Sequence, residues 1–170
     1  MSHEVEIGRG KRGRRAYTLD DIALVPARRT RDPEDVNVGW QIDAYHVDLP
    51  LMAAPMDSVM SPETAISFGR LGGIGVLDLD GLWTRYEDPE PILDQIAHLG
   101  EEESIATLQR VYSEPIKPTL ITERLTQLRE AGVVVAGKLS PQRVQQHWRA
   151  VVDAGVDLFI IRGSTVSAEH

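Results

Sequence analysis

The sequence of 170 residues contains no cysteine, so disulfides, thiolate metal sites and thiol nucleophiles are excluded within these residues. Long apolar runs are also missing. The longest stretches, such as residues 49–56, have about the length of a strand, so no membrane span and no signal-peptide core is predicted, and we expect a cytoplasmic location. Hydrophobic residues make up 42% and charged residues 26% of the chain, a balance typical of one ordinary folded domain rather than a disordered chain.

An excess of positive charge is also missing, since 18 Lys and Arg stand against 26 Asp and Glu and the formal net charge is -8. This argues against general nucleic-acid binding, which needs clustered Lys and Arg. One basic run stands out near the N-terminus: Arg9, Lys11, Arg12, Arg14 and Arg15. Because residues 1–16 show no apolar periodicity, we predict a flexible tail there, with an anion-contacting arm as the alternative. Residues 17–48 carry turn signals and short extended patterns, which predict a small irregular cap.

A strand, a helix and a second strand are predicted next. The apolar run 49–55 is typical of a strand buried on both faces. Ser61 and Pro62 then give a helix start, because serine caps helices and proline suits the first helical position. The glycines at 72–73 end this helix, and the apolar run 74–77 predicts the second strand.

The same order recurs twice more along the chain. A helical face of Ile121, Leu125 and Leu128 ends at Gly132, before a predicted strand at 133–136. Ser140 and Pro141 begin another helix, which ends at Gly155 before a strand at 158–161; its apolar positions are Val144, Trp148, Val151 and Val152.

Apolar strands that alternate with amphipathic helices predict an α/β fold with a parallel sheet. Both a doubly wound sheet and a (β/α)8 TIM barrel satisfy the pattern. No Gly-x-Gly-x-x-Gly loop follows the first strand, which weakens the dinucleotide-binding alternative. A barrel needs about 200 to 250 residues. We therefore expect one domain over residues 1–170 that is a truncated TIM barrel, with about four parallel strands.

Clusters of carboxylates are the remaining candidates for chemistry. Asp20 and Asp21, Asp78 and Asp80, and residues 101–103 lack the arrangement of a metal site, so we interpret them as solvated turns and helix starts. The serines lack a histidine placed to activate them. His46, His98, His147 and His170 are expected to be solvent-exposed or packing residues. We predict no catalytic residue and no metal site in the chain.

Three motifs resemble the IMP dehydrogenase/GMP reductase family: residues 17–26 (YTLDDIALVP), 49–59 (LPLMAAPMDSV) and 71–77 (LGGIGVL). The last two look like the first two barrel strands of that family, so the resemblance implies that residues 1–170 are the N-terminal half of its (β/α)8 barrel. Regulated members insert CBS domains after the second strand, for which residues 79–132 leave no room. The chain is thus similar to the branch without CBS domains, and residues 81–89 (GLWTRYEDP) fit that branch.

The resemblance implies two groups of binding residues. In the family, the loop after the first strand holds the purine nucleotide; here it offers Met56, and Ala54 where many relatives have serine. A polarizable methionine packs well on a flat ring; plain barrel packing is the alternative for Met56. The nicotinamide cofactor is contacted after the strand at 158–161, where this chain has Arg162, Gly163 and Ser164. Relatives usually have aspartate in place of Arg162, and the guanidinium favours a phosphate or carboxamide partner. A surface arginine is the alternative.

The implied reaction is attack of a cysteine thiolate on purine C2, with hydride transfer between that carbon and NAD or NADP. That cysteine would lie beyond His170, as would any bound monovalent cation. The resemblance favours IMP dehydrogenase (IMP to XMP). NADPH-dependent GMP reductase (GMP to IMP) is the second possibility, and a catalytically silent nucleotide-binding or oligomerising relative the third. The expected partners are a purine nucleotide monophosphate and further copies of the protein, as a tetramer at full length.

Overall fold

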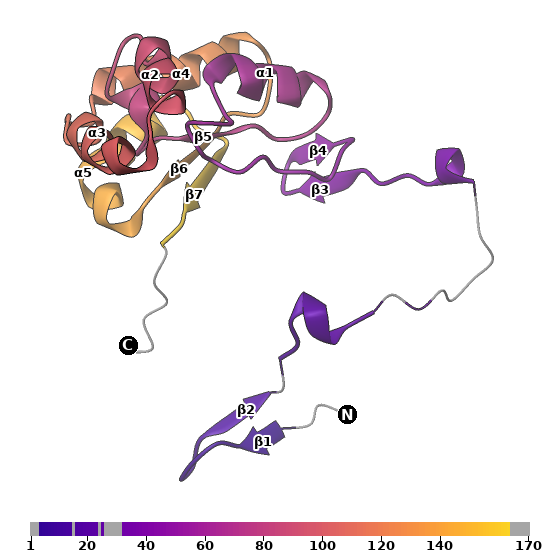
Figure 1. Cartoon of the computed structure of the whole chain (residues 1–170). Coiled ribbons are helices and arrows are strands. Elements are labelled where there is room, and N and C mark those ends of the chain that lie inside the picture. Colours follow the sequence, from indigo (N-terminus) through magenta and orange to yellow (C-terminus); the bar gives the residue numbers. More distant parts are fainter. Residues whose placement is uncertain (1–3, 15, 24, 26–31, 164–170) are drawn as a thin grey trace. The chain divides into compact units, whose positions relative to one another are not determined.

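The computed structural model describes residues 4–14, 16–23, 25 and 32–163 (Figure 1). The chain divides into two compact units, Met1–Asn37 and Val38–His170. Each is described by itself below. Ser164, one of the expected cofactor contacts, lies outside the described residues.

The first unit contains a short antiparallel hairpin, in which β1 (Glu4–Glu6) pairs with β2 (Arg12–Arg14). Two 3-10 helices follow, η1 (Leu19–Asp21) and η2 (Pro33–Asp35). The hairpin lies where the sequence predicted a flexible tail, and part of the basic run falls in β2. Its flexibility, and the alternative of an anion-contacting arm, stay predictions.

The second unit begins with another antiparallel hairpin, β3 (Trp40–Ile42) and β4 (Tyr45–Val47). The parallel sheet comes later in the chain: β5 (Val76–Asp78), β6 (Ala136–Leu139) and β7 (Leu158–Ile161), in the order β5-β6-β7. Its register places Val76 beside Ala136, and Ala136 beside Leu158. The predicted α/β fold with a parallel sheet is confirmed.

The run 49–55, predicted to be a strand buried on both faces, is the exception. It makes a single parallel bridge, between Met52 and Ile74, with hydrogen bonds from Ala53 N to Ile74 O (2.9 Å) and from Ile74 N to Leu51 O (3.0 Å). Leu51 is 53% and Met52 is 44% exposed, so the prediction of burial is wrong. The reason is position, because this segment lies at the edge of the sheet and no described residue pairs with its other side.

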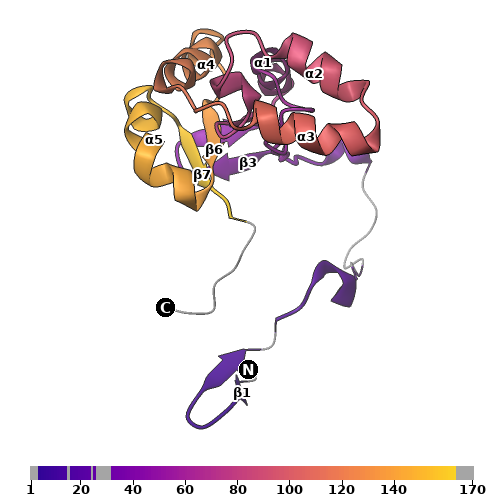
Figure 2. The same cartoon turned by 60° about the vertical axis from the view of Figure 1, so that its left-hand side comes forward.

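Helices α1 (Pro62–Arg70), α4 (Pro118–Glu130) and α5 (Pro141–Asp153) cover one face of the sheet, and α4 and α5 pack side by side (Figure 2). Each has proline in its first turn, and Ser61 Oγ accepts a hydrogen bond from Thr64 N (3.1 Å), as its predicted capping role requires. A glycine with positive φ follows each helix, as predicted: Gly72 (93°), Gly132 (72°) and Gly155 (73°).

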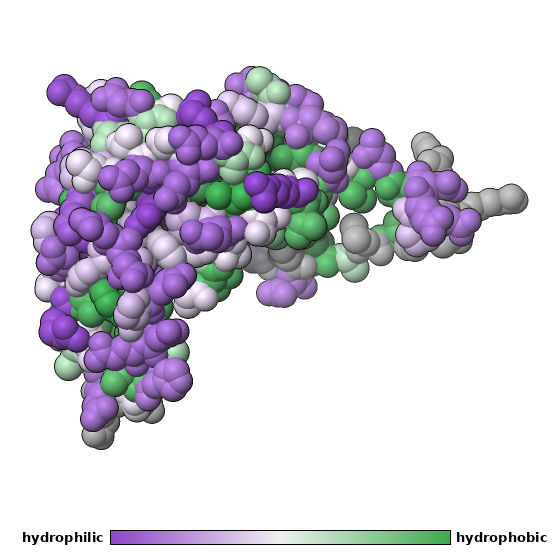
Figure 3. All heavy atoms as spheres, turned by 90° about the horizontal axis from the view of Figure 1, so that it is seen from above, coloured by the Kyte–Doolittle hydropathy of each residue, from purple (hydrophilic) through white to green (hydrophobic). Residues whose placement is uncertain are grey.

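The main core lies between these helices and the sheet. It is built from apolar residues of every layer: Ala65, Leu77, Leu79, Ile121, Leu125, Leu128, Val135, Leu139 and Val151. On the face seen from above, hydrophilic residues predominate, and hydrophobic residues show as scattered patches between them (Figure 3). The helices therefore direct their apolar sides inward, as amphipathic helices on a sheet do.

The opposite face of the sheet carries a second, smaller core of Val47, Ile74, Val76 and Ala136, which joins the β3–β4 hairpin to the sheet. Asp157 fastens the hairpin there, since it accepts hydrogen bonds from Tyr45 Oη (2.7 Å) and from Val135 N (2.8 Å). Side chains alternate along a strand, so Asp78 shares this face with Val76, and Lys138 shares it with Ala136. The carboxyl end of this face is therefore polar.

The segment between β5 and β6 is mainly helical. It contains η3 (Leu82–Thr84), α2 (Glu90–Ala97), α3 (Glu101–Val111) and α4. Among the residues that the structure describes, no helix combines the length and the apolar character that crossing a membrane requires.

Candidate functional site

Polar side chains gather where the parallel strands end. Asp78 is the last residue of β5, Lys138 lies one residue before the end of β6, and Asp57 follows the segment that bridges to Ile74. Ligands of α/β proteins bind at the carboxyl ends of the strands, because the following loops converge there. This edge of the sheet is therefore the expected position of a ligand-binding site.

An ion cluster occupies the centre of this edge. Lys138 Nζ lies 3.2 Å from Asp78 Oδ1 and 3.0 Å from Asp80 Oδ2, and all three side chains are less than one fifth exposed. Asp80 also accepts hydrogen bonds from Ser140 N (2.7 Å) and Ser140 Oγ (3.3 Å), which joins the loop after β5 to the start of α5. The prediction of a solvated turn at Asp78 and Asp80 is wrong, because their partner comes from the neighbouring strand and shields them from water.

Burial and pairing act against each other in this cluster. Burial raises the pKa of Asp78 above its ordinary value, although Asp80 N and Lys138 stabilise the carboxylate. Burial by itself would lower the pKa of Lys138, but hydrogen bonds and charges from Asp80 and Asp78 outweigh it and raise that pKa. Lys138 is therefore a permanent cation at neutral pH, suited to electrostatic stabilisation rather than to proton abstraction.

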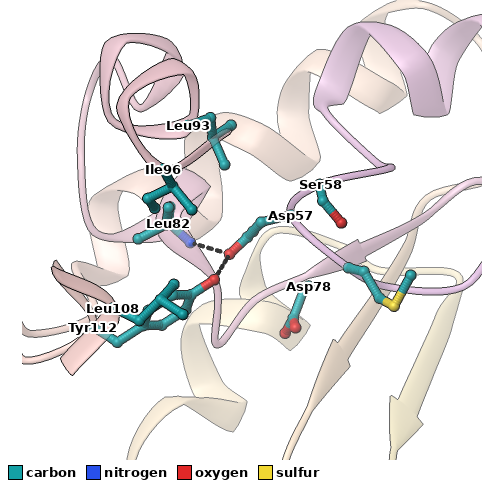
Figure 4. Close-up of a pocket in the computed structure, with 9 residues that line it drawn as sticks. Asp57, Ser58, Asp78, Leu82, Leu93, Ile96, Leu108 and Tyr112 are labelled. Atoms are coloured by element: carbon teal, nitrogen blue, oxygen red, sulfur yellow. Dashed lines mark hydrogen bonds between the residues drawn. The ribbon is translucent and has the colours of Figure 1, made fainter. Parts of the chain in front are cut away.

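A pocket of about 350 Å³ opens beside the cluster. One wall is polar and comes from the loop after the first apolar segment and from the end of β5: Met56, Asp57, Ser58 and Asp78. The other wall is largely apolar and comes from η3, α2, α3 and the residue after α3: Leu82, Leu93, Ile96, Leu108 and Tyr112 (Figure 4). A cavity with one apolar wall and a few polar groups is typical of a site for a small organic ligand.

Asp57 connects the two walls of this pocket. Its Oδ2 accepts hydrogen bonds from Leu82 N (2.8 Å) and from Tyr112 Oη (2.6 Å), both drawn in Figure 4. Its Oδ1 is buried and has no hydrogen-bond partner among the described residues. Burial raises the pKa of Asp57, and the two hydrogen bonds only partly offset that effect. Gly81 lies against this carboxylate, since a Cβ there would stand 2.0 Å from Oδ1.

The raised pKa of Asp57 predicts a change in the pH dependence of stability. A carboxyl whose folded pKa exceeds its ordinary value of 3.8 stabilises the fold fully below that value, and the contribution is lost as pH rises through the folded pKa. Asp57→Asn cannot ionise. The free energy of unfolding, measured by urea titration, should therefore increase for this variant relative to the wild type as pH rises from acidic to neutral. Parallel pH profiles of the two proteins would contradict the prediction.

Of the sequence-predicted site residues that the structure describes, one lies in the pocket. Met56 lines it and is 48% exposed. Ala54 is exposed in the same loop but does not line the pocket. Arg162 and Gly163 are exposed after β7, where Arg162 N donates to Leu139 O (3.1 Å). The binding roles of all four residues, and of Ser164, stay predictions.

Sequence reasoning missed Asp57, Lys138 and Tyr112. Asp57 lies inside the motif 49–59, directly after Met56, so its place in that motif was a signal that could have identified it. Lys138 and Tyr112 had none, because their partners are 60 and 55 residues away in sequence. Within the described ranges, no group of three or more His, Asp or Glu side chains is arranged to hold a metal ion.

This arrangement is suited to binding and orientation. The carboxylates and the Ser58 hydroxyl accept hydrogen bonds, the Met56 thioether offers a polarizable surface, and the apolar wall excludes water. Such a pocket fits a flat ring that carries N–H donors. The pocket contains no thiol, since the chain has no cysteine.

Known proteins are similar to this chain in sequence and in fold. The sequence profile described as IMP dehydrogenase / GMP reductase domain matches residues 16–169. An uncharacterized oxidoreductase of Mycolicibacterium smegmatis is 43% identical over 171 aligned residues, which cover 98% of this chain and 46% of that protein. An inosine-5'-monophosphate dehydrogenase of Methanocaldococcus jannaschii is 39% identical over a shorter stretch, 38% of this chain and 13% of that protein.

Among solved structures, the crystal structure of an IMP dehydrogenase/GMP reductase-like protein from Corynebacterium glutamicum matches with a TM-score of 0.82 and 43% sequence identity. The match covers 98% of this chain and 46% of that one. The chain therefore spans about half the length of these two relatives. The profile match over residues 16–169 and these two relatives lead to one conclusion: the chain belongs to the IMP dehydrogenase/GMP reductase family.

Proposed function

We propose that the chain supplies the N-terminal half of a (β/α)8 barrel in an oxidoreductase that acts on purine nucleotide monophosphates. One face of its parallel sheet is covered by helices, and the other carries a hairpin at one end and the ion cluster at the other. Helices on the outside of a parallel sheet, with polar groups at the carboxyl ends of its strands, are typical of such a barrel and support the proposal. The likeness to about half of the Corynebacterium glutamicum protein supports the proposal.

The observation that carries the nucleotide part of the proposal is the position of Met56. It borders a pocket at the carboxyl edge of the sheet, and the opposite wall is apolar. A purine ring placed between the two walls would bury its faces, and its N–H groups would meet acceptor oxygens. IMP and GMP both carry such a base.

A nicotinamide cofactor, which would accept or donate the hydride, is expected at the end of β7. The groups present fit it: Arg162 is exposed, its guanidinium has no hydrogen-bond or ion-pair partner among the described residues, and the neighbouring Gly163 has no side chain to obstruct a ligand. The guanidinium would bind a phosphate or a carboxamide. The choice between NAD and NADP belongs to this part of the proposal.

IMP dehydrogenase is the activity that we propose first, and GMP reductase is the alternative. Both need a cysteine thiolate at purine C2, which this chain does not contain. Absorbance of the nicotinamide in the whole protein separates the two, because IMP turnover reduces the cofactor and GMP turnover oxidises it. Binding of nucleotides without turnover of either would favour the catalytically silent relative.

The binding step is testable on this chain alone. We expect isothermal titration to detect IMP and GMP, with Met56→Ala weakening both by about 3- to 10-fold, because one thioether contact with an aromatic ring is lost. Met52→Ala is the matched control, since Met52 is similarly exposed, 44% against 48%, and does not line the pocket. Equal effects of the two substitutions would contradict the assignment of Met56.

A further inference from the structure

The helices that cover the pocket are held to the fold by few buried contacts. None of the residues of α2 is buried, and in the described part of α3 only Val111 is, whereas α4 buries five. Leu93, Ile96 and Leu108 nevertheless form the apolar wall of the pocket. Segments with little buried surface open at low free energy. The hydrogen bonds at the end of α3 therefore matter for keeping this cover in place.

Two tyrosines make those hydrogen bonds. Tyr86 Oη donates to Val111 O (3.0 Å), and Tyr112 Oη donates to Asp57 Oδ2 (2.6 Å). The guanidinium carbon of Arg85 lies 5.7 Å from the centre of the Tyr112 ring and adds a cation–π contact. Only the Tyr112 bond reaches across the pocket, from α3 to the loop that carries Met56 (Figure 4).

Asp57 transmits this contact to Met56, its neighbour in sequence. Hydrogen bonds from Val59 N (3.0 Å) and Met60 N (2.9 Å) to Met56 O fold the residues after Met56 into a turn. Asp57 Oδ2 fixes that turn against Leu82 and Tyr112, and Gly81 leaves the space for its carboxylate. The backbone path at Met56 thus depends on a junction of three segments.

We infer that Tyr112 is a positioning residue, which acts through Asp57 to hold Met56 in its binding orientation and to keep α2 and α3 over the pocket. The inference rests on the proposed nucleotide function, which it deepens. It follows that the helices between β5 and β6 are part of the binding device of this chain. The covered pocket can bind a nucleotide only while the hydrogen bond between Tyr112 and Asp57 is made.

Tyr112→Phe removes only the hydroxyl and tests the inference on the full chain. We expect the Met56 methyl resonance, assigned with Met56→Ala, to shift and broaden in the free protein, and GMP and IMP affinities to fall about tenfold. Tyr86→Phe is the matched control, because it removes a hydroxyl that donates to the same helix end, at Val111 O, and that makes no hydrogen bond with Asp57. That variant should leave the Met56 resonance unchanged.

Variants at Asp57 provide a second test in case Tyr112→Phe does not fold. Asp57→Asn keeps an oxygen that accepts from Leu82 N and Tyr112 Oη, and should retain the Met56 resonance; Asp57→Ala should move it as Tyr112→Phe does. A Met56 resonance unaltered in both Tyr112→Phe and Asp57→Ala would overturn the inference. The methyl readout needs no ligand. If the wild type binds neither nucleotide, the proposed function fails while the role of Tyr112 is still decided.

Discussion

Lys138→Met is expected to lower the free energy of unfolding by about 2 to 3 kcal/mol, a loss between those usual for a surface ion pair and for a buried one, because this pair is partly buried. The ammonium lies 3.2 Å from Asp78 Oδ1 and 3.0 Å from Asp80 Oδ2, whose side chains are 18% and 17% exposed. Methionine fills similar space but leaves both carboxylates without their cation. Urea unfolding followed by tryptophan fluorescence measures the loss.

Two further variants show whether charge is responsible. Lys117→Met removes an ammonium that is 41% exposed and 4.0 Å from Glu114, so its effect should stay below about 0.5 kcal/mol. Adding Asp78→Asn and Asp80→Asn to Lys138→Met should restore most of the lost stability, because the amides still accept from Asp80 N and Ser140 N. A triple variant as unstable as Lys138→Met would mean that the lysine stem, not its charge, matters.

This cluster shows where prediction from the sequence ends. Asp78 and Lys138 are paired by strand register across 60 residues, and no local pattern encodes that pairing. A carboxylate pair next to glycine is typical of a solvated turn, which is how Asp78 and Asp80 were interpreted. Their burial depends on the neighbouring strand, which a window of the sequence does not contain.

Helix ends were predictable because their signals are local. Ser61 accepts a hydrogen bond from a backbone N–H three residues later, and Gly132 and Gly155 take up the positive φ that ends a helix. The run 49–55 was misjudged because hydrophobicity indicates a strand but not its place in a sheet. Only the tertiary structure puts Met52 at the edge, 44% exposed.

The site was predictable only in part, for the same reason. The resemblance selected Met56, which does border the pocket. It did not select the opposite wall, because it assigned no binding role to the residues of α2 and α3, and their position against the pocket depends on contacts with distant residues. Tyr112 and Asp57 meet across 55 residues of sequence, so their hydrogen bond emerges only from packing.

Gly75→Ala is expected to destabilise the fold by about 3 kcal/mol, because α1 crosses β5 too closely for a methyl group. A Cβ on Gly75 would stand 2.5 Å from Ala65 Cα, 2.7 Å from Ala65 O and 2.8 Å from Ala65 Cβ. These are mostly backbone atoms in the middle of a helix, which cannot rotate away as a side-chain end does. Thermal and urea unfolding should both report the loss.

Gly100→Ala is the matched control, since a Cβ there meets nothing within 4 Å and only the N-cap of α3 changes, at a cost of about 1 kcal/mol or less. Combining Gly75→Ala with Ala65→Gly should recover little, because the Cα and carbonyl contacts remain. Full recovery would show that only the two methyl groups collide. In that case, backbone contact would not fix the close approach of α1 to β5. The path of the Met56 loop would not be fixed by it either, because this loop leads directly into α1.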